Sequence, residues 1–161
     1  MRKSLSEKEL KFISKLELKQ KYFFTRKEII SNFKSKNEMN VYLHRLKKKG
    51  RIIKLNKTKY FLIPVKAVNS KWAEHPFIII DEIMSGKDYC IAGKAAAYYH
   101  KLIDQVPAEF DVYNRRIHQS KKIFNARINF RKKRKLPESE AKTIHNHKFI
   151  IITKKEAKKW I

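Results

Sequence analysis

The fold of the N-terminal half is decided by residues 36–64, which read KNEMNVYLHRLKKKGRIIKLNKTKYFLIP. Apolar residues recur in its first part at intervals of three and four, as on one face of a helix: Met39, Leu43 and Leu46. We expect this helix to begin after Asn37, because asparagine is a favourable N-cap residue. We expect it to end at Gly50, since glycine suits the left-handed position that follows a helix.

A β-hairpin is predicted directly after this helix. Two short apolar runs, residues 51–55 and 60–63, flank a polar turn from Asn56 to Lys59. Pro64 ends the second run, because proline cannot continue a strand ladder.

Two shorter helices are expected before residue 36. Ser6 with Glu9, and Thr25 with Glu28, have the spacing of a capping box, in which each residue satisfies an unpaired backbone group at a helix start. Their inward sides are predicted to be Leu10, Ile13 and Leu16 in the first helix, and Ile29, Ile30 and Phe33 in the second. Three short helices followed by a basic hairpin is the order of a winged helix-turn-helix. An ordinary three-helix domain is the alternative.

The outward face of the third helix is the predicted reading surface for duplex DNA. At 100° per residue, the face opposite the apolar stripe carries Asn37, Asn40, Val41, His44 and Lys48, with Arg45 and Lys47 at its flanks. Asparagine pairs with adenine edges, arginine pairs with guanine, and a valine methyl group contacts the methyl group of thymine. We therefore expect base contacts from Asn40, Val41, His44 and Arg45. The alternative is an ordinary solvated helix face.

Further basic residues of the N-terminal half are candidate contacts to phosphates, which add affinity but little specificity. They are Lys54, Lys57 and Lys59 on or near the hairpin, together with Arg26 and Lys36. Solubility alone is the competing explanation for the hairpin lysines.

The second half mixes helices and strands, and we place the domain boundary so that residues 1–68 and 69–161 are separate domains. Predicted helices cover residues 76–85 and 93–102, and predicted strands cover residues 89–91, 110–113, 122–130 and 149–152. The expected fold class is α+β: an N-terminal winged helix-turn-helix followed by a small basic α+β domain.

The second half also carries a candidate DNA-binding patch. Arg115, Arg116 and Arg127 lie on or beside strands whose alternate residues are apolar, so we expect them to project together from one side of a sheet. The basic run that includes Arg131, Lys132 and Lys133 is expected close to them. A solvated loop is the alternative for that run.

The charge of the chain favours a polyanionic partner. The 161 residues include 40 Lys and Arg but only 15 Asp and Glu, which gives a formal net charge of +25. Residues 1–68 hold 20 basic and 5 acidic residues, and residues 69–161 hold 20 and 10. The single cysteine, Cys90, suits a reducing cytoplasm, and we expect neither a signal peptide nor a membrane span.

Enzymatic chemistry has weak support in the sequence. His145, Asn146 and His147 spell the name of a nuclease motif, but three adjacent residues do not supply its metal and base groups. Paired zinc-ligand spacing and a phosphate-binding glycine loop are both missing. For Glu109 and Asp111, two apart on a predicted strand, salt pairing is favoured over metal binding. We expect no catalytic residue, metal or cofactor. The alternatives are a DNA-processing nuclease and a nonspecific architectural protein.

Two stretches resemble AbiEi-type antitoxins of type IV toxin–antitoxin systems. Residues 42–52 with residues 59–64 resemble the winged-helix part of that family. Residues 89–102, followed by Pro107 and residues 110–113, look like the start of its C-terminal domain. The resemblance implies a repressor that binds inverted repeats in its own promoter. It also implies neutralisation of a nucleotidyltransferase toxin without a stable complex. The sequence leaves open whether the protein binds DNA as a monomer or as a dimer. The family usually continues into further helices after a strand like residues 149–152.

Overall fold

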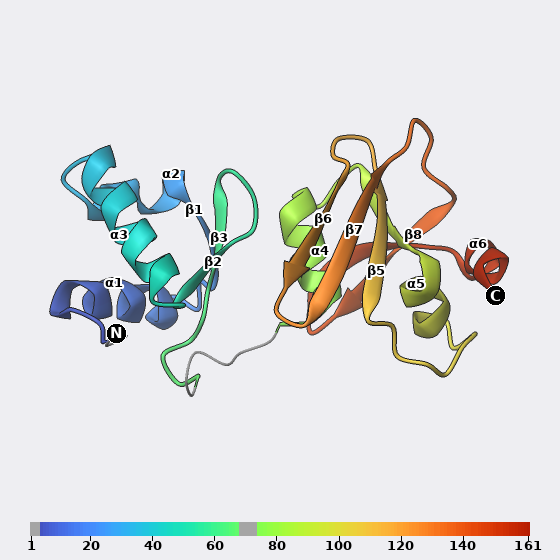
Figure 1. Cartoon of the computed structure of the whole chain (residues 1–161), viewed down its shortest axis with the longest axis horizontal. Coiled ribbons are helices and arrows are strands. Elements are labelled where there is room, and N and C mark those ends of the chain that lie inside the picture. The colour runs from blue at the N-terminus through green and yellow to red at the C-terminus, as the bar shows by residue number, and fades with distance from the viewer. Residues whose placement is uncertain (1–3, 68–73) are drawn as a thin grey trace. The chain divides into compact units, whose positions relative to one another are not determined.

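The computed structural model describes residues 4–67 and 74–161, and the chain divides into two compact units, Met1–Trp72 and Ala73–Ile161 (Figure 1). The predicted boundary between residues 68 and 69 lies outside the described residues. Both units mix helices with strands, so the α+β class is confirmed.

Over residues 4–67 the N-terminal unit contains three α-helices, a short 3-10 helix and a three-stranded antiparallel sheet. In chain order these are α1 (Glu7–Leu18), β1 (Phe23–Thr25), α2 (Arg26–Ile29), η1 (Ile30–Asn32), α3 (Lys36–Lys48), β2 (Ile52–Lys54) and β3 (Lys59–Leu62). The order of the strands is β1-β3-β2. The predicted hairpin of β2 and β3 is confirmed. Strand β1 was not expected from the sequence, and it pairs with β3 on the side opposite β2.

Capping explains where the helices begin. Both predicted capping boxes form, Ser6 with Glu9 and Thr25 with Glu28. The prediction that Asn37 caps the third helix is wrong. Ser35 is the N-cap instead, and its hydroxyl accepts a hydrogen bond of 3.1 Å from the backbone N–H of Glu38. A serine three residues before a glutamate offers the capping spacing two positions earlier than Asn37.

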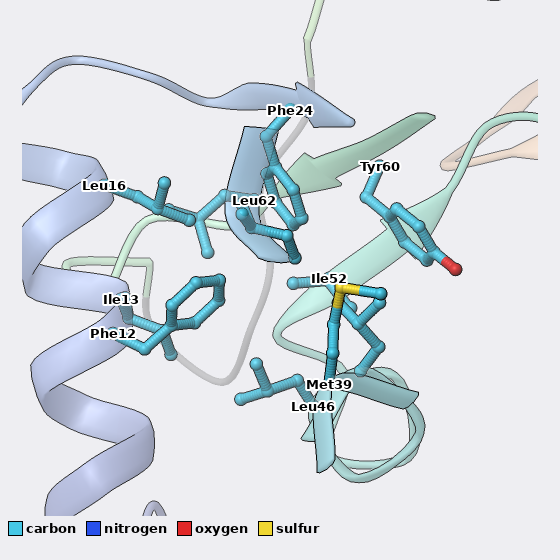
Figure 2. Packing of buried hydrophobic residues seen from close by; sticks show 11 residues of the cluster. Phe12, Ile13, Leu16, Phe24, Met39, Leu46, Ile52, Tyr60 and Leu62 are labelled. Atoms are coloured by element: carbon cyan, nitrogen blue, oxygen red, sulfur yellow. The ribbon is translucent and has the colours of Figure 1, made fainter. Parts of the chain in front are cut away.

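The core of this unit lies between α1, α3 and the sheet, and Figure 2 shows its packing. Side chains from all three helices and from the sheet meet there: Phe12, Ile13, Leu16, Phe24, Ile29, Met39, Leu43, Leu46, Ile52, Tyr60 and Leu62. The assignment of Leu10 to this core is wrong, since 44% of it is exposed. Phe12 of α1 is buried in the core instead, where its ring contacts the rings of Phe24 and Phe33.

The C-terminal unit is a six-stranded mixed sheet with helices on both faces. Its elements are α4 (Pro76–Met84), β4 (Tyr89–Ala92), α5 (Gly93–Tyr99), β5 (Glu109–Asn114), β6 (Gln119–Ile123), β7 (Ala126–Lys132), β8 (Ser139–Ile144), β9 (His147–Ile152), α6 (Lys154–Ala157) and η3 (Lys158–Trp160). The order of the strands is β6-β7-β5-β4-β9-β8, with parallel pairs at β5–β7 and β4–β9. Pro76 occupies the first turn of α4 as predicted, and α4 packs its apolar side on one face of the sheet.

Two predictions about strands in this unit need correction. The predicted single strand over residues 122–130 is wrong, because the chain reverses at Phe124 (φ 53°) and Asn125 to form the β6–β7 hairpin. The alternating pattern continues across the turn, so periodicity did not reveal it. Strand β8 was not predicted either, and it pairs with β9 through a turn at His145 and Asn146, both at positive φ.

Candidate nucleic-acid interface

The outward face of α3 is set by how the helix docks. Met39, Leu43 and Leu46 are buried against the sheet and α1. The opposite face is consequently exposed, and it carries the residues predicted for it: Asn37, Asn40, Val41, His44, Arg45 and Lys48. Val41 is 46% exposed, and packing within the unit leaves this apolar side chain at the surface.

A shallow cavity of about 260 Å³ lies beside that face, where α3 meets the start of α2 and the hairpin. The residues around it are mostly basic or polar: Arg26, Asn40, Leu43, His44, Lys47, Lys54 and Tyr60. Arg26 donates hydrogen bonds to the Oδ1 atom of Asn40 and, at 3.4 Å, to the Tyr60 hydroxyl. This arrangement fixes the side chain of Asn40 and brings basic side chains together around the hollow. Tyr60 was not among the residues predicted for this site, because the sequence placed it only in the second strand of the hairpin.

The hairpin turn is held rigidly next to this cavity. The Oδ1 atom of Asn56 accepts hydrogen bonds from the backbone N–H groups of Thr58 (3.0 Å) and Lys59 (2.9 Å). The backbone N–H of Arg26 donates to the carbonyl oxygen of Thr58 at 3.1 Å, which ties the turn to the start of α2. Lys54 and Lys57 are exposed on this hairpin, and Lys59 is half-buried.

Four basic residues of this surface have no acidic partner in the described part of the N-terminal unit. Within residues 4–67, Arg45, Lys48, Lys54 and Lys57 form no ion pair with a carboxylate. The nearby acids have other roles, since Glu28 and Glu38 cap helix starts. Lys36, in the first turn of α3, is exposed as well. This side of the unit therefore presents uncompensated positive charge.

The arginines predicted in the C-terminal unit do not form one patch. In the β5–β7 pair, Arg127 lies opposite Glu109, whereas Lys132 lies opposite Asn114 at the other end of the pair. Arg115 and Arg116 directly follow Asn114, so they lie far from Arg127. The expectation that the three arginines project together is therefore wrong.

Several of these arginines also have partners within the unit. The guanidinium group of Arg116 donates to the carbonyl oxygens of Met84 and, at 3.2 Å, of Lys87. Arg127 pairs with Glu109 at 3.6 Å, and Arg131 pairs with Asp111 at 3.4 Å. The predicted salt pairing of Glu109 and Asp111 is confirmed. Lys132 and Lys133 are exposed at the end of β7.

His147, one of the histidines considered above for nuclease chemistry, makes contacts that hold parts of the fold together. His147 contacts Asp81 through its Nε2 atom at 2.9 Å, and Asp81 accepts a hydrogen bond of 2.6 Å from the Tyr89 hydroxyl. These contacts join α4 to β4 and β9. In the part of the chain that the structure describes, three or more His, Cys, Asp and Glu side chains nowhere gather closely enough to hold a metal ion.

Comparisons with known proteins add no family assignment. No known family matches this chain, and no curated protein gives a significant match. Among residues 4–67 and 74–161, none of the helices has the length and apolar character needed to cross a membrane.

Proposed function

We propose that the N-terminal unit is a winged helix-turn-helix that binds duplex DNA with sequence preference. In this proposal α3 enters the major groove and the β2–β3 hairpin lies along the neighbouring phosphates. Asn40, Val41, His44 and Arg45 contact base edges. Arg26, Lys36, Asn37, Lys48, Lys54, Lys57 and Lys59 contact the sugar–phosphate backbone.

One observation carries the proposal: within residues 4–67, Arg45 and Lys48 on the outward face of α3 and Lys54 and Lys57 on the adjoining hairpin are exposed and form no ion pair with a carboxylate. A face evolved only for solubility carries mixed charges in most proteins. Here the polar side of a helix, held rigidly by a buried apolar stripe, also exposes Val41, and an exposed apolar group suits contact with a thymine methyl group.

On this basis we further propose that the protein is a cytoplasmic transcriptional regulator that represses a promoter containing inverted repeats. The additional role of neutralising a nucleotidyltransferase toxin rests on the sequence resemblance to AbiEi-type antitoxins alone. Co-expression with the product of a neighbouring nucleotidyltransferase gene tests that role: growth is restored if the chain is an antitoxin, and growth arrest persists if it is not.

The DNA-binding proposal is tested by selecting a preferred duplex from a random library and measuring its affinity for variants of the full chain. Asn40→Ala and Arg45→Ala are expected to weaken binding to the selected duplex by about 1–3 kcal/mol, or about 5- to 150-fold, with little change on random duplex. Lys57→Ala is expected to weaken both duplexes equally, because a phosphate contact carries no sequence information.

Lys11→Ala is the matched control. Lys11 is an exposed basic residue on α1 that pairs with Glu7, so its loss removes one positive charge from a helix that carries none of the proposed contacts. If Lys11→Ala reduces affinity for the selected duplex as strongly as Arg45→Ala, or if no duplex is preferred, α3 does not recognise base edges in the major groove. The preference for one duplex also separates this function from a nonspecific architectural role.

A further inference from the structure

The outer face of β6 and β7 is open in the C-terminal unit, and it borders β5, where the side chain of Asp111 is partly covered by the start of α5. In Figure 1, α4 lies behind β6 and β7, and no described helix of this unit stands in front of them. Ile128 and Phe130 point to the α4 side and are buried, so the alternate residues of β7 occupy the open face. The strand register places these residues on that face: Ser120 and Lys122 from β6, Arg127, Asn129 and Arg131 from β7, and Glu109, Asp111 and Tyr113 from β5.

Aromatic rings adjoin this open face at one end. The ring of Trp160 lies 6.1 Å from that of Tyr113, measured between centroids, and Trp160 is 40% exposed. The Nζ atom of Lys133 lies 5.1 Å from the centroid of the Tyr113 ring. An exposed tryptophan and a lysine therefore both lie against the ring of Tyr113 at this end of the face.

Hydrogen bonds across the strands hold the polar side chains of this face in place. The Nδ2 atom of Asn129 donates to Glu109 at 3.1 Å, and the Ser120 hydroxyl donates to the Oδ1 atom of Asn129 at 2.8 Å. Asp111 holds the Nε atom of Arg131 at 3.4 Å, while about half of the Arg131 side chain remains exposed. Because this hydrogen bond is made at the edge of the guanidinium group, the flat face of the group remains available for a nucleobase to stack on.

We propose that this face binds single-stranded nucleic acid. Trp160 and the guanidinium group of Arg131 stack on unpaired bases, and Lys122, Arg127 and Lys133 contact phosphates. From Arg127 to Arg131 the face extends for about 13 Å along β7, which gives room for a few nucleotides. The site is separate from the α3 surface and does not depend on the function proposed for it.

The chemistry of this face favours a single strand over a duplex. Glu109 and Asp111 offset two of the four basic residues named here, so charge alone attracts a duplex only weakly. Stacking contributes about 1–3 kcal/mol per base and needs bases that are unpaired, because the faces of paired bases are covered by their neighbours. The α3 surface has the opposite character, because its charge is uncompensated and neither α3 nor the β2–β3 hairpin, residues 36–62, contains a tryptophan.

The test measures binding of the full chain to fluorescein-labelled oligothymidine and oligouridine of 12 nucleotides by fluorescence anisotropy. Trp160→Ala is expected to weaken binding of both oligonucleotides about tenfold or more, and Trp160→Phe to retain most of the affinity. Tyr98→Ala is the matched control, since Tyr98 is also an aromatic residue that is 40% exposed but lies on α5. Tighter binding of oligouridine than of oligothymidine identifies RNA as the preferred strand, and the reverse identifies DNA.

A second readout does not depend on how well Trp160→Ala folds. The chain has two tryptophans, so a Trp72→Phe variant reports the fluorescence of Trp160 alone, and an oligonucleotide that stacks on this ring quenches it. Lys11→Ala, which removes a positive charge on α1 outside both proposed surfaces, is expected to leave oligonucleotide binding unchanged. Unchanged oligonucleotide affinity in Trp160→Ala, or titration of the Trp72→Phe variant without quenching, overturns the proposal.

Discussion

The two halves of the sequence hold equal numbers of basic residues, 20 in residues 1–68 and 20 in residues 69–161, but the two units use their charges differently. On the α3 face, Arg45 and Lys48 extend from the helix without acidic partners. On the open sheet face, Arg127 and Arg131 each lie beside a carboxylate on the neighbouring strand. The comparison teaches that the number of charges does not identify a binding surface for a polyanion. What matters is whether the charges are compensated by the residues next to them in space.

The largest expected effect is the salt dependence of duplex binding. If about six phosphates are neutralised, chiefly by the N-terminal unit, affinity should fall about a thousandfold between 50 and 200 mM salt. Binding titrations over that range give the slope directly. A nearly constant affinity would show that the uncompensated charge of the α3 surface does not meet phosphates, and the contrast between the two units would lose its functional meaning.

The second effect concerns the stability of the C-terminal unit at the edge of its open face. Gly93 has a φ of +64°, and a Cβ atom at this position would lie 2.6 Å from the Oδ2 atom of Asp111. Gly93→Ala should cost about 2–4 kcal/mol, because left-handed strain of about 1–2 kcal/mol adds to the overpacking. Urea denaturation followed by circular dichroism measures this change.

Gly86→Ala is the control for that substitution. Gly86 has a similar φ of +74°, but the nearest atom to an added Cβ is 4.0 Å away, so only the backbone strain of about 1–2 kcal/mol remains. Equal losses of stability in the two variants would mean that Asp111 moves aside easily and does not hold Arg131 firmly.

The third effect concerns the buried carboxylate of Glu9 in the N-terminal unit. Burial of Glu9 by itself raises its pKa, but the hydrogen bonds and charge of Lys49, together with hydrogen bonds at Ser6, outweigh burial and lower the pKa below its ordinary value of 4.5. A lowered pKa stabilises the fold above the unfolded pKa of about 4.5, and this contribution is lost as the pH falls through the folded pKa.

Glu9→Gln should therefore destabilise the protein at pH 7 by about 1.5 kcal/mol, the low end for hydrogen bonds to charged groups, because Lys49 can turn toward solvent. The difference from the unmodified chain should shrink below pH 4. Thermal unfolding between pH 3 and pH 7 checks both statements. A difference that is constant over this range would show that Glu9 acts through packing and not through its charge.

The smallest expected effect concerns the ion pair between Arg127 and Glu109 on the open sheet face. Glu109→Gln frees Arg127 from its pairing and should raise the affinity for random duplex about two- to fivefold at low salt, with a stability change of about 0.5 kcal/mol or less. Glu7→Gln, which frees Lys11 on α1, is the control because it changes the net charge equally. If both variants raise affinity by the same factor, net charge governs binding and local compensation does not.

Much of the N-terminal unit follows from its sequence. The capping boxes at Ser6 and Thr25, the left-handed Gly50 and the apolar stripe of α3 are local features, in which residues a few positions apart decide the structure. The same stripe determines which residues of α3 are exposed, so the helical period alone is enough to name the candidate reading residues. Capping and helical periodicity act within one or two turns, and the sequence records them directly.

Contacts between distant segments were decided only by the tertiary structure. The pairing of β1 with β3, the pairing of Arg127 and Arg131 with acids about 20 residues earlier, and the meeting of Tyr113 with Trp160 join segments that no local pattern relates. The β6–β7 turn was hidden because alternation continues through it, and β8 was missed because its exposed polar residues carry little apolar signal. Strand pairing and charge compensation depend on which segments become neighbours in the folded sheet, and the energies that select those neighbours are spread over the whole unit.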